Sequence, residues 1–162
     1  MTGLSATAED ERSPDFCGAV HATTVAIGGR AVVIRGESGA GKSDLALRLI
    51  DRGAQLLSDD YTRVEARDGQ VIASPAPNIT GLIEVRGLGP VEMPHTDQAP
   101  VALVVALAPP SGPEPERYPP EGLSTRLCGV DLPLLHLRGL EASAPIKVEL
   151  ALKGAGGQGT RP

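Results

Sequence analysis

The stretch Gly36-Glu37-Ser38-Gly39-Ala40-Gly41-Lys42-Ser43 decides the fold, because it has the spacing G-x-x-x-x-G-K-[ST] of a phosphate-binding P-loop. Its glycines allow the backbone to bring amide groups close to phosphate oxygens. The lysine of such a loop reaches the β- and γ-phosphates of a nucleotide, and the hydroxyl that follows it holds Mg²⁺. The stretch therefore predicts a loop that binds ATP and Mg²⁺.

The residues on both sides of the loop fit this prediction. Residues 31–34 form a short apolar run typical of a strand, and residues 42–51 place apolar side chains three and four positions apart, as in a helix. Gly28-Gly29 predicts a tight turn that joins an earlier strand, 19–27, to the strand entering the loop. We therefore expect an α/β fold with a mixed sheet and the P-loop between a strand and a helix.

The rest of the chain predicts one domain over residues 17–152, after a flexible leader at 1–16 and before a disordered, glycine-rich tail at 153–162. Six prolines make residues 109–120 a loop, and Asp68-Gly69 predicts a hairpin turn. Gly53 predicts the end of the helix. Further strands are expected at 55–57, 61–65, 70–73, 82–85, 91–93, 101–107, 132–137 and 146–152.

Composition excludes several classes of protein. The net charge is −5 and no basic stripe is present, which argues against a nucleic-acid partner. The longest apolar run, 101–108, is too short to cross a membrane. Cys17 and Cys128 have neither the spacing of a metal site nor that of a disulfide framework. We therefore expect reduced thiols and a cytoplasmic protein.

Two adjacent acids, Asp59 and Asp60, follow the strand expected after the helix. In an open α/β sheet that strand end opens on the ligand crevice. A carboxylate there can accept a proton from an attacking hydroxyl or hold Mg²⁺. Neighbours on a strand point to opposite sides, so we expect only one of them to face the γ-phosphate. The alternative is an ordinary polar Ser-Asp-Asp turn.

Three functions remain open on these residues. The base-reading Asn-Lys-x-Asp segment of GTPases is absent from the sequence, and 101–108 ends in Pro109-Pro110 rather than in the carboxylate of a mechanical ATPase. A protein kinase, a small-molecule kinase and a nucleotide-sensing module without transferase activity are the alternatives.

The chain resembles the catalytic domain of HPr kinase/phosphorylase, a bacterial enzyme that phosphorylates a serine of the phosphocarrier protein HPr. Three segments carry the resemblance: His21 through the P-loop, Arg52-Gly53 with 57–60, and Ile83-Glu84-Val85-Arg86-Gly87-Leu88-Gly89. The third is the most specific, because P-loop proteins at large do not carry it. The resemblance implies the fold of that catalytic domain and an ATP- and Mg²⁺-dependent protein serine kinase.

The resemblance also implies the roles of individual residues. Asp59 would accept the serine proton in the kinase direction and return it when phosphate attacks phosphoserine. Without the resemblance, Glu84 could be an exposed edge residue, His21 an ordinary surface histidine and Arg117 a solvated charge. The implied catalytic residues are His21, Lys42, Asp59 and Arg117, and the implied magnesium ligands are Ser43 and Glu84. The implied ATP-binding residues are Gly36, Glu37, Ser38, Gly39, Ala40, Gly41, Lys42 and Ser43.

Partners and direction of reaction follow from the same resemblance. An HPr-like phosphocarrier is the implied substrate, and the family's hexamer makes a homo-oligomer possible. The family's N-terminal domain has no counterpart before His21, so we expect a catalytic-domain form. Residues 140–145 do not match the family's basic segment linked to dephosphorylation. The kinase direction is therefore expected ahead of the phosphorylase direction.

Overall fold

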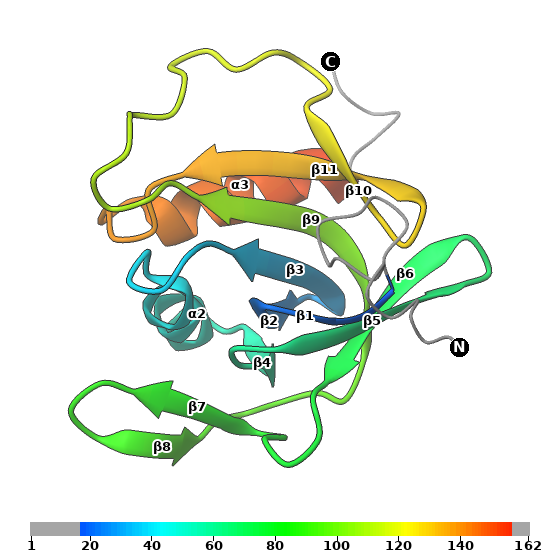
Figure 1. Ribbon diagram of the computed structural model, residues 1–162, viewed down its shortest axis with the longest axis vertical. Helices are drawn as coiled ribbons and strands as arrows, with labels where there is room; N and C mark the ends of the chain where they lie inside the picture. Colours follow the sequence, from blue (N-terminus) through cyan, green and yellow to red (C-terminus); the bar gives the residue numbers. More distant parts are fainter. Residues whose placement is uncertain (1–16, 157–162) are drawn as a thin grey trace, which may run out of the picture.

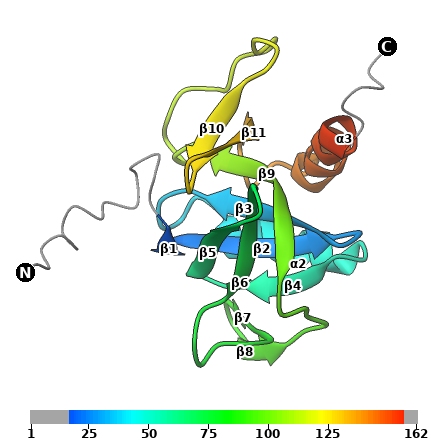
Figure 2. The same ribbon diagram turned by 90° about the vertical axis from the view of Figure 1, so that its right-hand side faces the viewer.

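The computed structural model describes residues 17–156, so the predicted leader at 1–16 and residues 157–162 lie outside the described part. Within that part, a nine-stranded mixed sheet curls on itself, two helices cover one of its faces, and a separate two-stranded hairpin lies below them (Figures 1 and 2). The elements are β1 Gly18–Val20, β2 Ala22–Ile27, β3 Arg30–Arg35, α2 Lys42–Asp51, β4 Gln55–Ser58, β5 Thr62–Arg67, β6 Gln70–Pro75, β7 Leu82–Val85, β8 Gly89–Glu92, β9 Ala99–Leu107, β10 Ser124–Leu127, β11 Val130–Leu137 and α3 Ala144–Gly156.

Three neighbouring strands, β3, β9 and β11, run parallel at the centre of the sheet. β2 pairs antiparallel with β3 as the predicted hairpin, and β4 pairs with β2 at the edge. The sheet is therefore mixed, as expected. The carboxyl ends of parallel strands meet at one edge, and there β3 enters the 36–43 loop and α2.

The strands β3 and β9 are largely buried on both faces, which explains their apolar runs at 31–34 and 101–107. In β3, Val32 and Ile34 belong to the core shared with α2 and α3, while Ala31 and Val33 belong to a second core on the opposite face. This alternation follows from the two-residue period of a strand. The second core is enclosed by the curl of the sheet itself, which brings β1, β5, β6, β10 and β11 around it.

The helix α2 begins and ends at glycines with positive φ. Gly41 is its N-cap at φ 103°, and Gly53, at φ 113°, donates its amide to the Ile50 carbonyl at 2.9 Å after the last turn. Leu45 and Leu49 are fully buried against the sheet. Burial of a leucine contributes about 1.5–3 kcal/mol, so this face fixes the helix and therefore the loop that precedes it.

The predicted strand at 146–152 is wrong: these residues lie in the helix α3. The alternating sequence Ile-Lys-Val-Glu-Leu is compatible with a strand, but the buried positions are Ala144, Val148 and Leu152, spaced four apart as on a helix. Pro145 stands in the first turn, where a helix tolerates proline. The first four residues of the expected tail, 153–156, are likewise the last turn of α3.

Two further segments between β9 and β11 can be compared with the expectations. Residues 108–123 contain neither helix nor strand, which agrees with the proline-rich loop predicted at 109–120. The strand β10 was not predicted. It pairs antiparallel with β11, and its sequence Ser-Thr-Arg-Leu has too few apolar residues to be recognised alone.

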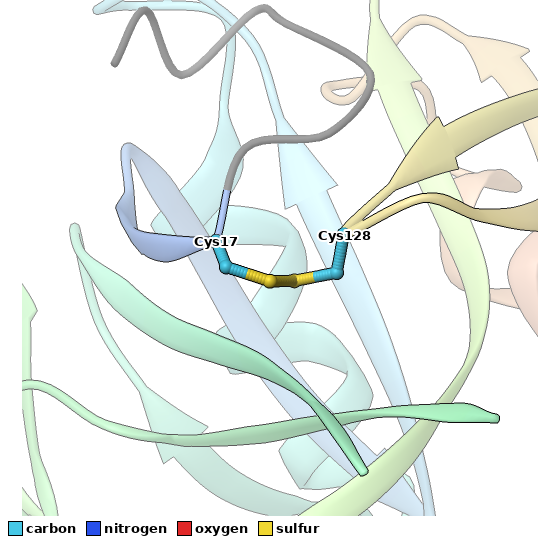
Figure 3. Close-up of a disulfide and its surroundings, with 2 residues drawn as sticks. All are labelled: Cys17 and Cys128. Carbon is cyan, nitrogen blue, oxygen red and sulfur yellow. A yellow bond between two sulfur atoms is a disulfide. The ribbon is translucent and has the colours of Figure 1, made fainter. Parts of the chain in front are cut away.

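The expectation of reduced thiols is also wrong. Cys17 and Cys128 form a disulfide with a Cα–Cα distance of 4.9 Å, across 111 residues of sequence (Figure 3). Cys17 directly precedes β1, and Cys128 lies in the turn between β10 and β11. Spacing could not reveal this pair, because only the curl of the sheet brings the two segments together.

No helix of residues 17–156 is long and apolar enough to span a membrane.

Candidate functional site

A pocket of about 570 Å³ opens beside the 36–43 loop, at the amino end of α2. The loop, the first turns of α2, the hairpin β7–β8 and the segment after β11 all contribute to its walls. The lining residues are Ser38, Gly39, Gly41, Lys42, Ser43, Asp44, Leu47, Asp60, Glu84, Val85, Arg86 and Leu140.

The 36–43 loop folds around the ammonium group of its own lysine. Lys42 is buried, and its Nζ donates to the Gly36 carbonyl at 2.7 Å and to the Glu37 carbonyl at 3.4 Å. The first amides of α2 have no intrahelical acceptor, and the N-cap residue, Gly41, has no side chain that could accept from them. Helix dipole and amides together make this end of α2 suited to an anion.

Asp59 joins three elements of the site. Its Oδ1 accepts hydrogen bonds from Ser43 Oγ at 2.6 Å and from Thr23 Oγ1 at 3.1 Å. Its Oδ2 accepts the amide of Glu84 at 3.0 Å. With 7% of its surface exposed, this carboxylate ties α2 to β2 and β7, and both of its oxygens are engaged.

Asp60 has a different environment, although it is the next residue. Its φ of 70° turns the chain after β4, and its side chain is 65% exposed and lines the pocket. Its Oδ1 lies 3.1 Å from His21 Nε2, and the His21 ring packs on Tyr61 with centroids 5.1 Å apart. The Asp60 amide donates to Thr23 Oγ1 at 3.1 Å. Of the two adjacent acids, Asp60 is the one that faces the open pocket.

The structure brings Glu84 to this site but not Arg117. Glu84 is an exposed residue of β7 that lines the pocket. Its backbone N–H donates a hydrogen bond to Asp59, the carboxylate that also accepts from Ser43. Arg117 lies in the 108–123 loop, where its guanidinium carbon is 6.0 Å from the centre of the Tyr118 ring. It is exposed and does not line the pocket.

Sequence reasoning missed two residues that shape the site. Thr23 holds both acids through one hydroxyl, and its signal was the pair of threonines, Thr23 and Thr24, inside the buried strand β2. Leu140 lines the pocket from the segment after β11, where no motif marks it.

Oxygen atoms of Ser43, Asp59 and Glu84 are among the groups near the loop that suit a hard cation. Among residues 17–156, no cluster of three or more His, Cys, Asp or Glu side chains has the arrangement of a metal site. A Mg²⁺ ion that accompanies a nucleotide needs only one or two protein ligands, because phosphates and water supply the others. The residues present therefore fit Mg²⁺ brought with a nucleotide better than a metal held by protein alone.

Comparisons with known proteins point in one direction. A family model described as HPr Serine kinase C-terminal domain matches residues 17–137. HPr kinase/phosphorylase of Limosilactobacillus reuteri (strain DSM 20016) is 44% identical over 75 residues, which are 46% of this chain and 23% of the relative. HPr kinase/phosphorylase of Clostridium beijerinckii is 45% identical over 75 residues, 46% of this chain and 24% of the relative. The match thus spans less than a quarter of each of these relatives.

A solved structure is similar over most of its length. The Hpr(Ser) kinase/phosphatase from Coxiella burnetii superimposes with a TM-score of 0.70 at 26% sequence identity. The similarity covers 84% of this chain and 88% of that one. Its extent includes the curled mixed sheet and therefore agrees with the fold expected from the sequence.

Proposed function

Because this chain belongs to the family of HPr serine kinase C-terminal domains, we propose that it transfers the γ-phosphoryl group of ATP to a serine of HPr or a homologous phosphocarrier. One observation supports this beyond family membership. An exposed carboxylate, Asp60, and an anion-binding helix end face the same pocket, which is the arrangement that transfer from a nucleotide to a hydroxyl needs.

The 36–43 loop would hold the nucleotide. Its amides and the first turn of α2 would bind the β- and γ-phosphates. The Lys42 ammonium would exchange its contacts with the Gly36 and Glu37 carbonyls for phosphate oxygens. Its burial supports this role, because a buried cation interacts more strongly with phosphate than a solvated one does.

Ser43 and Glu84 are the residues that would hold Mg²⁺, and Asp59 would orient the Ser43 hydroxyl through their 2.6 Å hydrogen bond. When bound, the cation neutralises charge on the phosphate oxygens. The three hydrogen bonds to Asp59 fix the relative positions of α2, β2 and β7, and so preorganise the two ligands.

We assign the general base to Asp60 in place of Asp59. The Asp60 carboxylate is open to the pocket, whereas both oxygens of Asp59 already accept hydrogen bonds. Asp60 would take the proton of the acceptor serine as its oxygen bonds to the γ-phosphorus and the bond from that phosphorus to the ADP oxygen breaks. His21, at 3.1 Å, would orient Asp60.

The reverse reaction would use the same groups. Phosphate would attack phosphoserine to form pyrophosphate, and Asp60 would return the proton to the serine oxygen. Arg117 would join the site only if the 108–123 loop moved, because in this structure it stands outside the pocket. We propose the kinase direction as the principal activity.

Location and assembly complete the proposal. A cytoplasmic site of action and a homo-oligomer remain parts of it. The Cys17–Cys128 disulfide argues against the cytoplasmic site of action, because disulfides are rare in reducing compartments. Alkylation of the protein at cell lysis, followed by mass measurement, tests whether that bond is closed in the cell. Sedimentation velocity tests the assembly.

The decisive experiment is mass spectrometry of an HPr-like protein after incubation with this protein and MgATP. We expect one added phosphate on a serine, and none with Lys42→Ala. A carrier that stays unmodified while ATP still binds would instead support a nucleotide-sensing module.

A further inference from the structure

The segment between β11 and α3, residues 138–143, packs directly on the 36–43 loop. A Cβ added to Gly139 would lie 2.7 Å from the Ala40 carbonyl oxygen and 2.7 Å from Leu107 Cδ1. A Cβ added to Gly41 would lie 2.9 Å from Leu140 Cδ2. The absence of side chains at these two glycines is what lets the segment touch the loop.

An arginine of α2 clamps this segment in place. The guanidinium of Arg48 donates through Nη1 to the Glu141 carbonyl at 2.9 Å and through Nη2 to the Gly139 carbonyl. Its Nε donates to Asp44 at 2.9 Å, one helical turn earlier. The two carbonyls on either side of Leu140 are therefore occupied by Arg48, and the position of Leu140 is fixed from both sides.

A second link holds α3 against α2. Arg52 donates to both carboxylate oxygens of Glu149, at 2.9 and 2.7 Å. This hydrogen-bonded contact, with the charge of Glu149, raises the pKa of Arg52 above its usual value. The segment 138–143 and the helix α3 that follows it are thus each linked to α2 by an arginine of that helix.

Leu140 itself is 61% exposed, although its backbone is held firmly. It lines the same pocket as the 36–43 loop, together with Leu47 and Val85. Covering an exposed leucine with a ligand is favourable, because apolar surface is removed from water. Small-molecule pockets pair such apolar surface with a few fixed polar groups. Leu150 is equally exposed, at 61%, but does not line the pocket.

We propose that Leu140 is the apolar platform for the base of the bound nucleotide and that Arg48 holds the platform in position. The inference rests on the proposed function, since it presumes phosphates at the amino end of α2. From there the rest of a nucleotide must extend over the neighbouring surface, and Leu140 contacts Gly41, the N-cap of that helix.

The contacts of the platform also define its selectivity. Because the Gly139 and Glu141 carbonyls already accept hydrogen bonds from Arg48, this segment offers the base an apolar side chain instead of those acceptors. Apolar contact to a ring face does not depend on the groups at the edge of the base. Leu140 therefore supports ATP and GTP alike.

The test is calorimetric titration of the full chain with ATP, GTP and inorganic tripolyphosphate. Leu140→Ala should weaken ATP and GTP binding alike, by about tenfold, because the shorter side chain no longer covers the face of the base. Tripolyphosphate binding should stay unchanged, because it has no base. Leu150→Ala is the matched control, and all three affinities should equal those of the unmodified protein. Arg48→Ala should reproduce the pattern of Leu140→Ala in weaker form.

A titration result that departs from this pattern overturns the inference. Equal ATP affinity in Leu140→Ala and the unmodified protein would remove the platform, as would an equal loss for tripolyphosphate or a loss confined to one base. A change only in the KM for the phosphocarrier would assign Leu140 to the protein substrate. If ATP binds through Leu140 but no phosphoserine forms on HPr, the kinase proposal fails while the platform stands.

Discussion

The floor and the rim of the pocket differ in how firmly their polar groups are held. The floor comprises Lys42 and Ser43, which line the pocket, and the buried residues Asp59 and Thr23, which do not line it. The polar side chains of the floor are hydrogen-bonded to one another or to backbone carbonyls. The rim comprises the exposed pocket residues Asp60 and Glu84, together with the partly exposed His21, which contacts Asp60 from outside the pocket lining. Groups on the floor are held by hydrogen bonds within the protein, whereas the rim carboxylates are open to solvent and to an incoming substrate. The boundary between the two falls between adjacent residues, Asp59 and Asp60.

The largest expected effect is at the rim. Asp60→Asn removes the proposed proton acceptor, so transfer to the phosphocarrier should fall by about a thousandfold. The melting temperature should hardly change, because the side chain is exposed. The rate of phosphoserine formation measures the transfer, and thermal unfolding measures the melting temperature. Full activity in Asp60→Asn, with a collapse in Asp59→Asn, would return the base to Asp59.

The next effect is at the floor. Asp59→Asn replaces an acceptor of three hydrogen bonds by an amide that must present N–H groups to some of the same donors. The free energy of unfolding should fall by about 1–3 kcal/mol. Urea denaturation measures it, with Asp60→Asn as the control of similar shape change. A loss of activity without any loss of stability would contradict a positioning role.

A smaller effect of the same kind is expected at Thr23. Thr23→Val keeps the shape but deletes the hydroxyl that donates to Asp59 and accepts the Asp60 amide. We expect a loss of about 1 kcal/mol in stability, with Thr24→Val in the same strand as the neighbouring comparison. If Thr23→Val lowers turnover far more than stability, the hydroxyl also orients the rim.

The smallest effect is expected outside the pocket. Arg117→Ala should change ATP affinity by less than about twofold, because an exposed arginine outside the pocket makes at most a weak, screened contribution. Calorimetric titration with ATP measures it. A large loss of phosphoryl transfer with unchanged ATP affinity would show that the 108–123 loop closes on the site during the reaction, and would extend the rim to include this loop.

How much could be predicted depended on how local the information was. The glycines and lysine of the 36–43 loop determine a local conformation, so its place between β3 and α2 was predicted from the motif and from the apolar patterns on both sides of it. Only the resemblance chose Asp59 over Asp60; residue spacing alone could not, because the environments of the two acids depend on the positive φ at Asp60 and on the position of Thr23 in a separate strand. Sequence alone supplies neither.

Features that depend on contacts between distant residues could not be predicted for a related reason. The sequence of 146–152 satisfies both a strand and a helix pattern, and only the burial of Val148 and Leu152 against the sheet selects the helix. The role of Leu140 depends on two glycines that are far apart in sequence, Gly41 and Gly139. Arg117 was assigned by resemblance, yet its loop extends away from the sheet (Figure 1).

The disulfide makes residues 17 to 128 a covalent ring. Every residue that the sequence predicted for the site, from His21 to Arg117, lies inside this ring, whereas Leu140 and α3 lie outside it. A protease that cuts once in the exposed 109–120 loop therefore opens the ring without releasing a fragment. Electrophoresis without reductant should show one band after such a cut, and electrophoresis with reductant should show two.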